Sequence, residues 1–306
     1  MVYTEIIERK AKRYYYRVKS IREGNKVNKK KVYLGVNLSK RELLRGEKKA
    51  DKELVILNNL LTEKEIKELN KIKEEYLKQP NKNIENRYEA FCSLFTYNST
   101  AIEGNTLTLQ ETAQLLFDGI SPNKSLREIN EIINHKEALD YILKNKDDIS
   151  KKIILKLHEI VVKNTLKKEL EDQIGKYRNV QVYIRGVEWM PTKQKEVPKE
   201  MRKLLLWYSR NKNKLHPIIL TAYFHSAFES IHPFVDGNGR VGRLLMNLIL
   251  HKNKYPMINI PNSKKSVYYK VLEESQLKGN IRPFIEFLIK LLKEDFSTLS
   301  WTRAIS

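Results

Sequence analysis

The chain has 306 residues, 41% of them hydrophobic, and a formal net charge of +21. This length suits one large domain or two smaller ones with a real core. Because no stretch approaches the roughly 18 apolar residues of a membrane span, we expect no membrane partner. The single cysteine, Cys92, excludes an internal disulfide framework, and the charged N-terminus lacks the apolar core of a signal peptide. These features predict a soluble cytoplasmic protein.

The positive charge is concentrated near the N-terminus. Residues 1–50 hold 16 Lys/Arg and 5 Asp/Glu, a net charge of +11, and the rest of the chain carries the other +10. Such a segment favours acidic partners: a nucleic acid, an anionic membrane surface or an acidic protein. A general bias toward lysine, isoleucine and asparagine would also make a basic surface, without any partner. We favour that bias for the body of the chain, and for residues 9–31 the two interpretations carry equal weight.

Two runs rich in aromatic and β-branched residues, at 13–22 and 27–35, flank the turn Glu23–Lys26 and predict a β-hairpin. Tyr14, Tyr16 and Val18 would share one face, because side chains alternate along a strand. A lone hairpin is marginally stable in water, so we expect it to dock on the protein or on a partner. Residues 1–50 are therefore predicted to form a basic N-terminal β-hairpin module.

Helical periodicity dominates the chain from about Ser39 onward. Leucines at helix spacing run from Leu54 to Leu61, and Ile66, Leu69 and Ile72 continue the pattern. Further helices are predicted over residues 84–102, 108–117, 125–145, 150–165, 197–211, 215–230, 239–252, 264–277 and 281–294. Residues 177–192 alternate instead, which predicts a second, inserted hairpin. The expected fold is mainly α with two small hairpins, and residues 51–306 form its helical domain.

The segment from His232 to Arg243, HPFVDGNGRVGR, lies between two strongly helical stretches and runs into a helix N-terminus. Unpaired backbone N–H groups and the helix dipole make such a terminus an anion site. Asn238 offers a side-chain amide, Asp236 suits Mg²⁺ held against phosphates, and His232 suits a general base. Gly237 and Gly239 let the backbone approach a phosphate closely, and Arg240 and Arg243 offer guanidinium groups to phosphate oxygens. The loop therefore predicts a site for a nucleotide, a metal and a base.

This loop resembles the signature of the Fic family, HPFx(D/E)GNGRxxR, at every position. The resemblance continues in Gly175–Arg178 and the hairpin after it, which are similar to the family's flap, and in residues 268–288, which resemble the stretch closing its nucleotide pocket. About residues 84–294 look like a Fic core with its regulatory helix, and residues 1–50 lie outside it. The expected fold is thus a Fic-type helical bundle with an inserted β-hairpin flap.

The resemblance implies a protein adenylyltransferase that uses Mg²⁺ and transfers AMP from ATP to a Ser, Thr or Tyr hydroxyl of a target protein or of itself. His232 would take the hydroxyl proton, Asp236 would bind Mg²⁺, and Arg243 would face the γ-phosphate. The flap 177–192 would dock the target protein by strand addition. The residues implied in nucleotide binding are Asp236, Gly237, Asn238, Gly239, Arg240, Arg243, Ile184, Arg185, Gly186, Val187, Tyr268 and Tyr269. Family members that transfer phosphoryl or phosphocholine groups have other residues at positions 237 and 239. Gly237 and Gly239 therefore favour transfer of AMP.

Residues Ser99–Gly104 resemble the family's inhibitory motif, (S/T)xxxE(G/N), on a helix over about residues 84–104. Ser99 and Glu103 lie four residues apart and would share a helix face. By resemblance, Glu103 would pair with Arg243 and occupy the place of the γ-phosphate, so that the resting protein is mostly inhibited. A homodimer interface is one way in which that helix could be held in place.

Two alternatives remain open on the sequence. The same site could remove AMP from proteins, because some inhibited relatives use this glutamate to position water. The other is a nucleic-acid-binding regulator acting through residues 1–50, where Tyr14, Tyr15, Tyr16 and Arg17 interleave aromatic and basic groups. The salt dependence of DNA binding, with and without that segment, distinguishes this regulator from the enzyme.

Overall fold

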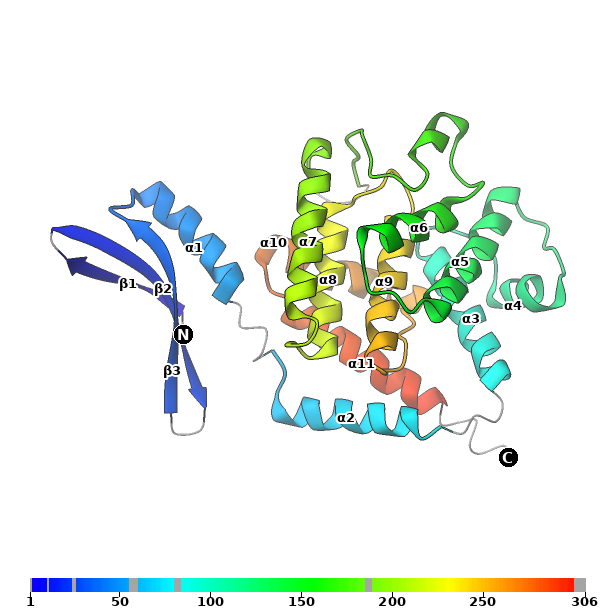
Figure 1. Cartoon of the computed structure of the whole chain (residues 1–306). Coiled ribbons are helices and arrows are strands. Elements are labelled where there is room, and N and C mark those ends of the chain that lie inside the picture. The colour runs from blue at the N-terminus through cyan, green and yellow to red at the C-terminus, as the bar shows by residue number, and fades with distance from the viewer. Residues whose placement is uncertain are drawn as a thin grey trace. The chain divides into compact units, whose positions relative to one another are not determined.

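The computed structural model describes residues 2–9, 11–23, 26–54, 60–79, 84–184 and 189–299. The chain divides into two compact units, residues 1–60 and residues 61–306. A small antiparallel sheet with one helix forms the first unit, and helices form the second (Figure 1). This confirms the mainly α fold class with a small N-terminal β module. No helix in the described ranges is long and apolar enough to cross a membrane.

The N-terminal sheet has three antiparallel strands in the order β1 (Val2–Arg9), β2 (Lys12–Glu23) and β3 (Lys26–Val36). Strands β2 and β3 are the predicted hairpin, whose turn at residues 24–25 lies outside the described residues. The sequence prediction misses β1, because its mixture of charged and apolar residues has no turn signal before it. This strand pairs with β2 along its whole length, so the hairpin docks on a third strand of its own unit.

Helix α1 (Lys40–Leu54) packs on one face of this sheet. Thr4 and Arg17 lie opposite one another on β1 and β2, and both bind Glu47 of the helix; Arg17 Nη1 lies 3.2 Å from Glu47 Oε1. The opposite face carries Tyr16 and Tyr33, whose ring centroids are 5.3 Å apart. Among the described elements of this unit, α1 therefore covers one face of the sheet and no helix covers the tyrosine-bearing face, although Val18 on that face is fully buried.

The second unit contains the predicted helices, with small shifts at their ends. In chain order they are α2 (Glu63–Leu77), α3 (Ile84–Ala101), α4 (Leu109–Ala113), which continues as a π-turn over Gln114–Asp118, α5 (Leu126–Lys144), α6 (Lys151–Val162), α7 (Val197–Asn211), α8 (Pro217–Ile231), α9 (Asn238–Lys252), α10 (Lys265–Lys278) and α11 (Arg282–Leu299). The capping box expected at Thr108 is present and begins α4.

The helical pattern predicted from Leu54 to Leu61 is wrong at its end, because Leu60 and Leu61 do not lie in a helix. Helix α1 ends at Leu54, residues 55–59 lie outside the described residues, and a new helix begins after Thr62. The Thr62 side chain accepts from the Glu65 N–H while the Glu65 carboxylate accepts from the Thr62 N–H. This capping box stabilises a helix start, and here it outweighs the spacing of the leucines.

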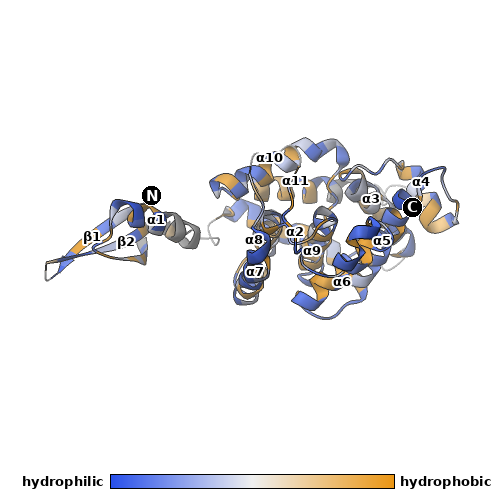
Figure 2. Ribbon diagram, turned by 90° about the horizontal axis from the view of Figure 1, so that it is seen from above, coloured by the Kyte–Doolittle hydropathy of each residue, from blue (hydrophilic) through white to orange (hydrophobic). Residues whose placement is uncertain are grey.

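Helices α8 and α9 lie at the centre of the second unit and are buried along most of their length. Figure 2 shows hydrophobic and hydrophilic residues alternating around the helices of this unit, as expected for helices with one face in the core. The central pair contributes a large share of the core through Ile218, Leu220, Phe224, Phe228, Val241, Leu244, Leu245 and Leu248. The loop that joins the two helices is consequently fixed at both ends by the core.

The predicted second hairpin is absent as paired strands from residues 177–184 and 189–192, the described part of 177–192. Arg178 supplies the anchoring that a partner strand would give. Its guanidinium is 2% exposed and donates to the carbonyls of Val180 at 2.9 Å, of His232 at 2.8 Å, and of Thr192. Because one side chain ties both ends of the segment to the α8–α9 loop, the alternating pattern forms no ladder there.

Candidate active site

The α8–α9 loop turns sharply at both ends. His232 ends α8 with its backbone in the left-handed region, φ 51°, and its N–H donates to the Phe228 carbonyl at 2.9 Å. Gly237 precedes α9 at φ 77°, and a Cβ on it would lie 2.8 Å from Val162 Cγ1. Glycine alone fits that position without strain. These turns hold the loop against the N-terminus of α9, where unpaired N–H groups favour an anion.

Asn238 closes the loop on itself. Its Oδ1 accepts from the Phe234 N–H and its Nδ2 donates to the Phe234 carbonyl, both at 2.9 Å. The Phe234 ring stacks on His158 with centroids 3.8 Å apart, which anchors the loop in the core. The side-chain amide that the sequence suggested for phosphate binding is therefore engaged in fixing the loop backbone.

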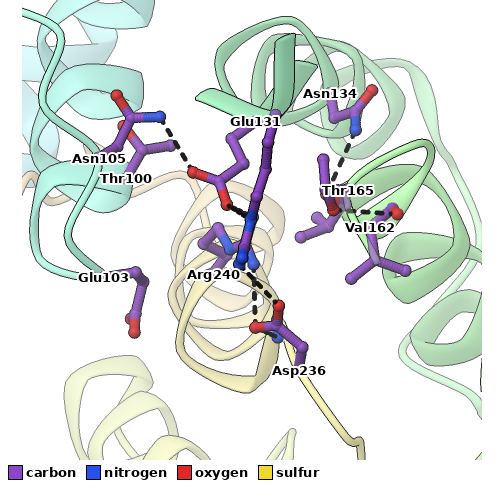
Figure 3. A network of polar contacts seen from close by, with 12 residues as sticks. Thr100, Glu103, Asn105, Glu131, Asn134, Val162, Thr165, Asp236 and Arg240 are labelled. Carbon is purple, nitrogen blue, oxygen red and sulfur yellow. Dashed lines mark hydrogen bonds and ion pairs between the residues drawn. The ribbon is translucent and has the colours of Figure 1, made fainter. Parts of the chain in front are cut away.

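Asp236 and Arg240 belong to a polar network with Glu131 of α5 (Figure 3). Arg240 Nη2 donates to Asp236 Oδ1 at 3.1 Å, and its Nη1 lies 3.6 Å from Glu131 Oε1. Burial acts to raise the pKa of Asp236, but Arg240 and the Gly237 N–H outweigh it and hold the pKa below its ordinary value. Asp236 is thus ionised, and the buried Arg240 guanidinium is already paired with two carboxylates.

Asp236 fits a Mg²⁺ ion that is shared with phosphates. Within the described residues its Oδ2 has one long contact, 3.4 Å to Arg127 Nη2, and its side chain is 35% exposed. The described part of the chain holds no group of three or more His, Cys, Asp or Glu that could bind a metal ion by itself. Since Mg²⁺ commonly takes one or two carboxylates plus phosphate oxygens, this residue suits a metal that arrives with a nucleotide.

Arg243 of α9 is held by the end of α3. The side chain is 1% exposed; Nε donates to Ser99 Oγ at 3.0 Å, and Nη2 donates to the Ser99 carbonyl and to Glu103 Oε1, both at 2.7 Å. Glu103 lies beyond Ala101, the last residue of α3, so it reaches Arg243 from a turn and not from the helix face of Ser99. A Cβ on Gly239 would lie 2.1 Å from Glu103 Oε1, so this carboxylate rests on the loop backbone.

A cavity of about 710 Å³ opens beside this ion pair, a size typical of small-molecule sites. The predicted residues that line it are His232, Gly239, Arg243, Glu103, Ile184, Tyr268 and Tyr269. Gln276 lines it as well. Four predicted nucleotide residues do not line this cavity: Asp236 and Gly237 lie in the adjoining loop, and Asn238 and Arg240 lie in the first turn of α9. The remaining three, Arg185, Gly186 and Val187, lie outside the described residues.

The two tyrosines of α10 contribute differently to the cavity. Tyr268 is 1% exposed and its hydroxyl lies 2.7 Å from His225 Nε2, so it is mainly a core residue. Tyr269 is 42% exposed, with its ring centroid 5.4 Å from that of Tyr268. Tyr269 therefore offers the ring surface, and Tyr268 supports it from behind.

The sequence prediction misses Glu229, one helical turn before His232. Glu229 Oε2 lies 3.9 Å from His232 Nδ1, and neither that nitrogen nor Glu229 Oε1 has a hydrogen-bond partner among the described residues. Burial raises the pKa of Glu229 to about 8 and lowers the pKa of His232 to about 4. The imidazole is consequently neutral at pH 7, as a general base requires. The sequence signal that could have identified Glu229 is its place as the one carboxylate in the apolar run TAYFHSAFESI.

Comparisons with known proteins agree with this geometry. Residues 148–250 match the model of the Fic/DOC family. Over 212 residues the chain is 36% identical to the protein adenylyltransferase Fic of Drosophila persimilis and 37% identical to that of Drosophila melanogaster, in each case over 67% of this chain. The alignments cover 40% and 41% of those proteins, so the chain spans about two fifths of the length of the curated relatives it matches.

Solved structures show the same likeness. A Fic-domain-containing signaling protein from Bacteroides thetaiotaomicron aligns with a TM-score of 0.69 at 29% identity, over 76% of this chain and 95% of that one. Fic-1 from C. elegans aligns with a TM-score of 0.70 at 27% identity, over 88% of this chain and 80% of that one. A helical unit whose two central helices are joined by a histidine- and arginine-bearing anion loop is a Fic fold. The chain belongs to the Fic/DOC family.

Proposed function

We propose that this protein is a protein adenylyltransferase that transfers AMP from ATP to a Ser, Thr or Tyr hydroxyl of a target protein or of itself. The observation that carries the proposal is the meeting of a neutral His232, the Gly239 backbone and the Arg243 guanidinium at one cavity of nucleotide size. The printed names of the Drosophila relatives, protein adenylyltransferase Fic, support it.

In the proposed reaction His232 Nε2 takes the proton of the target hydroxyl. The hydroxyl oxygen attacks the α-phosphorus of ATP, the bond from that phosphorus to the bridging oxygen breaks, and pyrophosphate leaves. Such chemistry depends on positioning and on charge stabilisation more than on covalent participation by the protein. Arg243 would neutralise the γ-phosphate, and the backbone N–H groups at the start of α9 would face the remaining phosphates.

Mg²⁺ bound to the phosphates, with Asp236 as its protein ligand, would supply charge neutralisation and orientation. Arg240 then acts on Asp236: its guanidinium keeps the carboxylate ionised and aimed, at 3.1 Å. Tyr269 would cover the adenine ring, supported by Tyr268. We propose that the segment 177–192 docks the target protein, because Arg178 ties its ends to the carbonyl of His232 and so brings a bound peptide next to the base.

Glu229 would serve His232 as a positioning residue. A neutral imidazole acts as a base at Nε2 when Nδ1 carries the proton; the backbone of Glu229 interacts with the imidazole, and Glu229 Oε2 lies 3.9 Å from Nδ1. Catalytic hydrogen bonds often tighten in the complex with substrate. Once His232 becomes an imidazolium, an adjacent carboxylate that loses its own proton stabilises the positive charge.

The ion pair between Glu103 and Arg243 would inhibit the resting protein. Arg243 Nη2 donates to Glu103 Oε1 at 2.7 Å, and the carboxylate covers the Gly239 backbone. A γ-phosphate needs the same guanidinium, and an anion placed there would meet the charge of Glu103. Release of the inhibition then requires Glu103 to leave Arg243, a shift between two populations.

The test incubates wild type, Glu103→Gly and Glu103→Gly/His232→Ala with Mg²⁺ and ATP labelled at either the α- or the γ-phosphate. The proposal expects α-label on protein with Glu103→Gly, none with the double variant, and no γ-label in any sample. Loss of AMP from a pre-modified protein, with no α-label transferred, would support AMP removal instead. Protein-bound γ-label would identify a kinase and contradict the proposal.

In this reaction no group comes from residues 1–50. We propose that this segment binds an acidic partner, because its net charge of +11 is about half of that of the whole chain.

A further inference from the structure

One face of the N-terminal sheet combines tyrosines with basic residues. On β2 the alternating residues Lys12, Tyr14 and Tyr16 point to one side, opposite to Arg17, which binds α1 through Glu47. Residues directly opposite one another on paired strands share a face, so the register adds neighbours from β1 and β3. We call this set the tyrosine face: Tyr3, Glu5, Ile7, Arg9, Lys12, Tyr14, Tyr16, Val18, Lys29, Lys31, Tyr33 and Val36.

The tyrosines form one packed cluster in the middle of this face. The Tyr33 ring centroid lies 5.3 Å from that of Tyr16 and 6.5 Å from that of Tyr14, and Tyr33 is 52% exposed. A platform for single strands needs separate ring faces on which successive bases stack. These rings are tilted by 35° and 50° to one another instead, so they do not present a row of separate parallel faces. Tyrosine hydroxyls are common donors to phosphate oxygens of a duplex.

The basic residues lie at both ends of the cluster. Arg9 and Lys12 pair across the β1–β2 end, and Lys29 and Lys31 lie toward the β2–β3 end; all four are exposed. Eight residues of β2 separate the register positions of Lys12 and Lys29, a distance of about 27 Å at roughly 3.4 Å per residue. This distance exceeds the width of the DNA major groove, which is about 12 Å, so the two groups would contact phosphates beyond both edges of the groove.

Glu5 is the acidic residue within the face, and Lys31 neutralises it: Lys31 Nζ lies 2.5 Å from Glu5 Oε2. Figure 2 shows hydrophilic stretches along the strands of this unit. Of the aliphatic residues on this face, Val18 is fully buried and Val36 is 40% exposed, beside the exposed Tyr33. The charge, its placement at two ends and the packed tyrosines fit a polyanion with two parallel rows of charge better than a single strand.

We propose that the tyrosine face binds double-stranded DNA. This names the partner and the surface behind the acidic-partner proposal, and it is independent of AMP transfer. Arg9, Lys12 and Lys29 bind phosphates beyond both edges of the groove, Lys31 stays paired with Glu5, the tyrosine hydroxyls donate between them, and α1 stiffens the sheet from the opposite face. Contacts of this kind position the protein and carry no base preference by themselves.

Fluorescence anisotropy of the full chain with a labelled duplex of about 20 base pairs tests the inference. Three phosphate contacts, by Arg9, Lys12 and Lys29, predict a slope of log K against log salt of about −2.7. Lys12→Glu/Lys29→Glu should raise Kd at least tenfold and make the slope shallower by about 1.8. Lys40→Glu/Arg41→Glu, an equal charge change at exposed residues of α1, is the matched control and should raise Kd less than threefold.

An equal loss of binding in the α1 control would overturn the proposal, because it would show a general effect of charge. Tighter binding of a single strand than of the duplex would also overturn it, and so would duplex binding that stays unchanged in Lys12→Glu/Lys29→Glu. Thermal unfolding of each variant checks that the chain still folds. Transfer of α-label in the Glu103→Gly background should be unchanged by the face variants, which separates failure of this inference from failure of the proposed enzyme.

Discussion

Arg243 Nη2 lies 2.7 Å from Glu103 Oε1, and the two residues come from α9 and from the turn after α3. Arg243 is 1% exposed, so no solvent shares this contact on its side. Coulomb attraction at low dielectric makes such a pair stronger than a surface ion pair, although desolvation offsets part of the gain. In the proposed reaction an ATP γ-phosphate would therefore compete with a preformed ion-pair partner of the buried Arg243.

Removing the carboxylate should activate the protein. We expect Glu103→Gly to raise the rate of AMP transfer at least tenfold, about 1.4 kcal/mol of barrier, because Arg243 then becomes available to the γ-phosphate. Glu103→Gln should give a smaller increase, since it removes the charge and keeps a hydrogen-bond acceptor. The matched control is Glu85→Ala, an exposed acidic residue in the first turn of α3, which should leave the rate unchanged. Equal rates in wild type and Glu103→Gly would contradict an inhibitory ion pair.

Glu229 should make the stability of the protein depend on pH. The folded chain holds its proton to about pH 8, whereas the unfolded chain releases it near the ordinary value of 4.5. The folded state thus binds more protons in this window, and stability falls as pH rises from about 4.5 to 8. Glu229→Gln cannot titrate, so its Tm relative to wild type should increase between pH 5 and pH 8 by several degrees. The difference should stay constant for the exposed control Glu137→Gln.

The same variant tests the positioning of His232. In the Glu103→Gly background, Glu229→Gln keeps an oxygen that can accept from Nδ1 but cannot become a carboxylate. We expect kcat to fall roughly tenfold to a hundredfold with KM for ATP little changed, because the loss concerns the charged imidazolium and not nucleotide binding. A larger rise in KM than fall in kcat would mean that Glu229 shapes the cavity instead.

The pH–rate profile should lack the usual histidine inflection. Burial lowers the pKa of His232 to about 4, so the neutral base persists throughout pH 6 to 8. In Glu103→Gly the rate of AMP transfer should fall only below about pH 5, as His232 becomes protonated. A half-maximal rate near pH 6.5 would show that His232 titrates as an exposed histidine and would contradict this environment.

Asn238 should matter for folding as well as for activity. Asn238→Ala leaves the buried N–H and carbonyl of Phe234 without their partners, which costs about 1–3 kcal/mol. A decrease in Tm of roughly 3–10 °C should follow. Asn280→Ala removes an exposed contact to Glu274 and is the control, expected within about 1 °C of wild type. An unchanged Tm in Asn238→Ala would mean that the loop is held mainly by the Phe234 ring.

Much of this architecture follows from local sequence signals. Periodic apolar residues and caps predict α3 to α11. The residues of the contiguous loop His232–Arg243 are enough to predict its chemistry. The contact between Arg243 and Glu103 was expected only through family resemblance, because 139 residues lie between the two in sequence and no local pattern joins them. Glu229 is missed because a lone carboxylate in a helix is usually solvated, and only the packing of α8 shows that this one is buried.

In the segment 177–192 a local sequence pattern is present but predicts the wrong structure for the described residues. Its alternation is a genuine strand signal, yet the buried guanidinium of Arg178 fixes the described residues as a loop. Strand β1 is missed for a related reason, since pairing with β2 stabilises it more than its own composition suggests. In both cases a long-range contact decides the local structure.

The most direct test of the central claim is the intact mass of the protein after incubation with ATP and Mg²⁺. Glu103→Gly, alone or with a cell extract as a source of targets, should give protein that is heavier by one AMP moiety, and Glu103→Gly/His232→Ala should give none. The same adduct in the double variant, or no adduct on any protein with Glu103→Gly while ATP still binds, would contradict AMP transfer by His232.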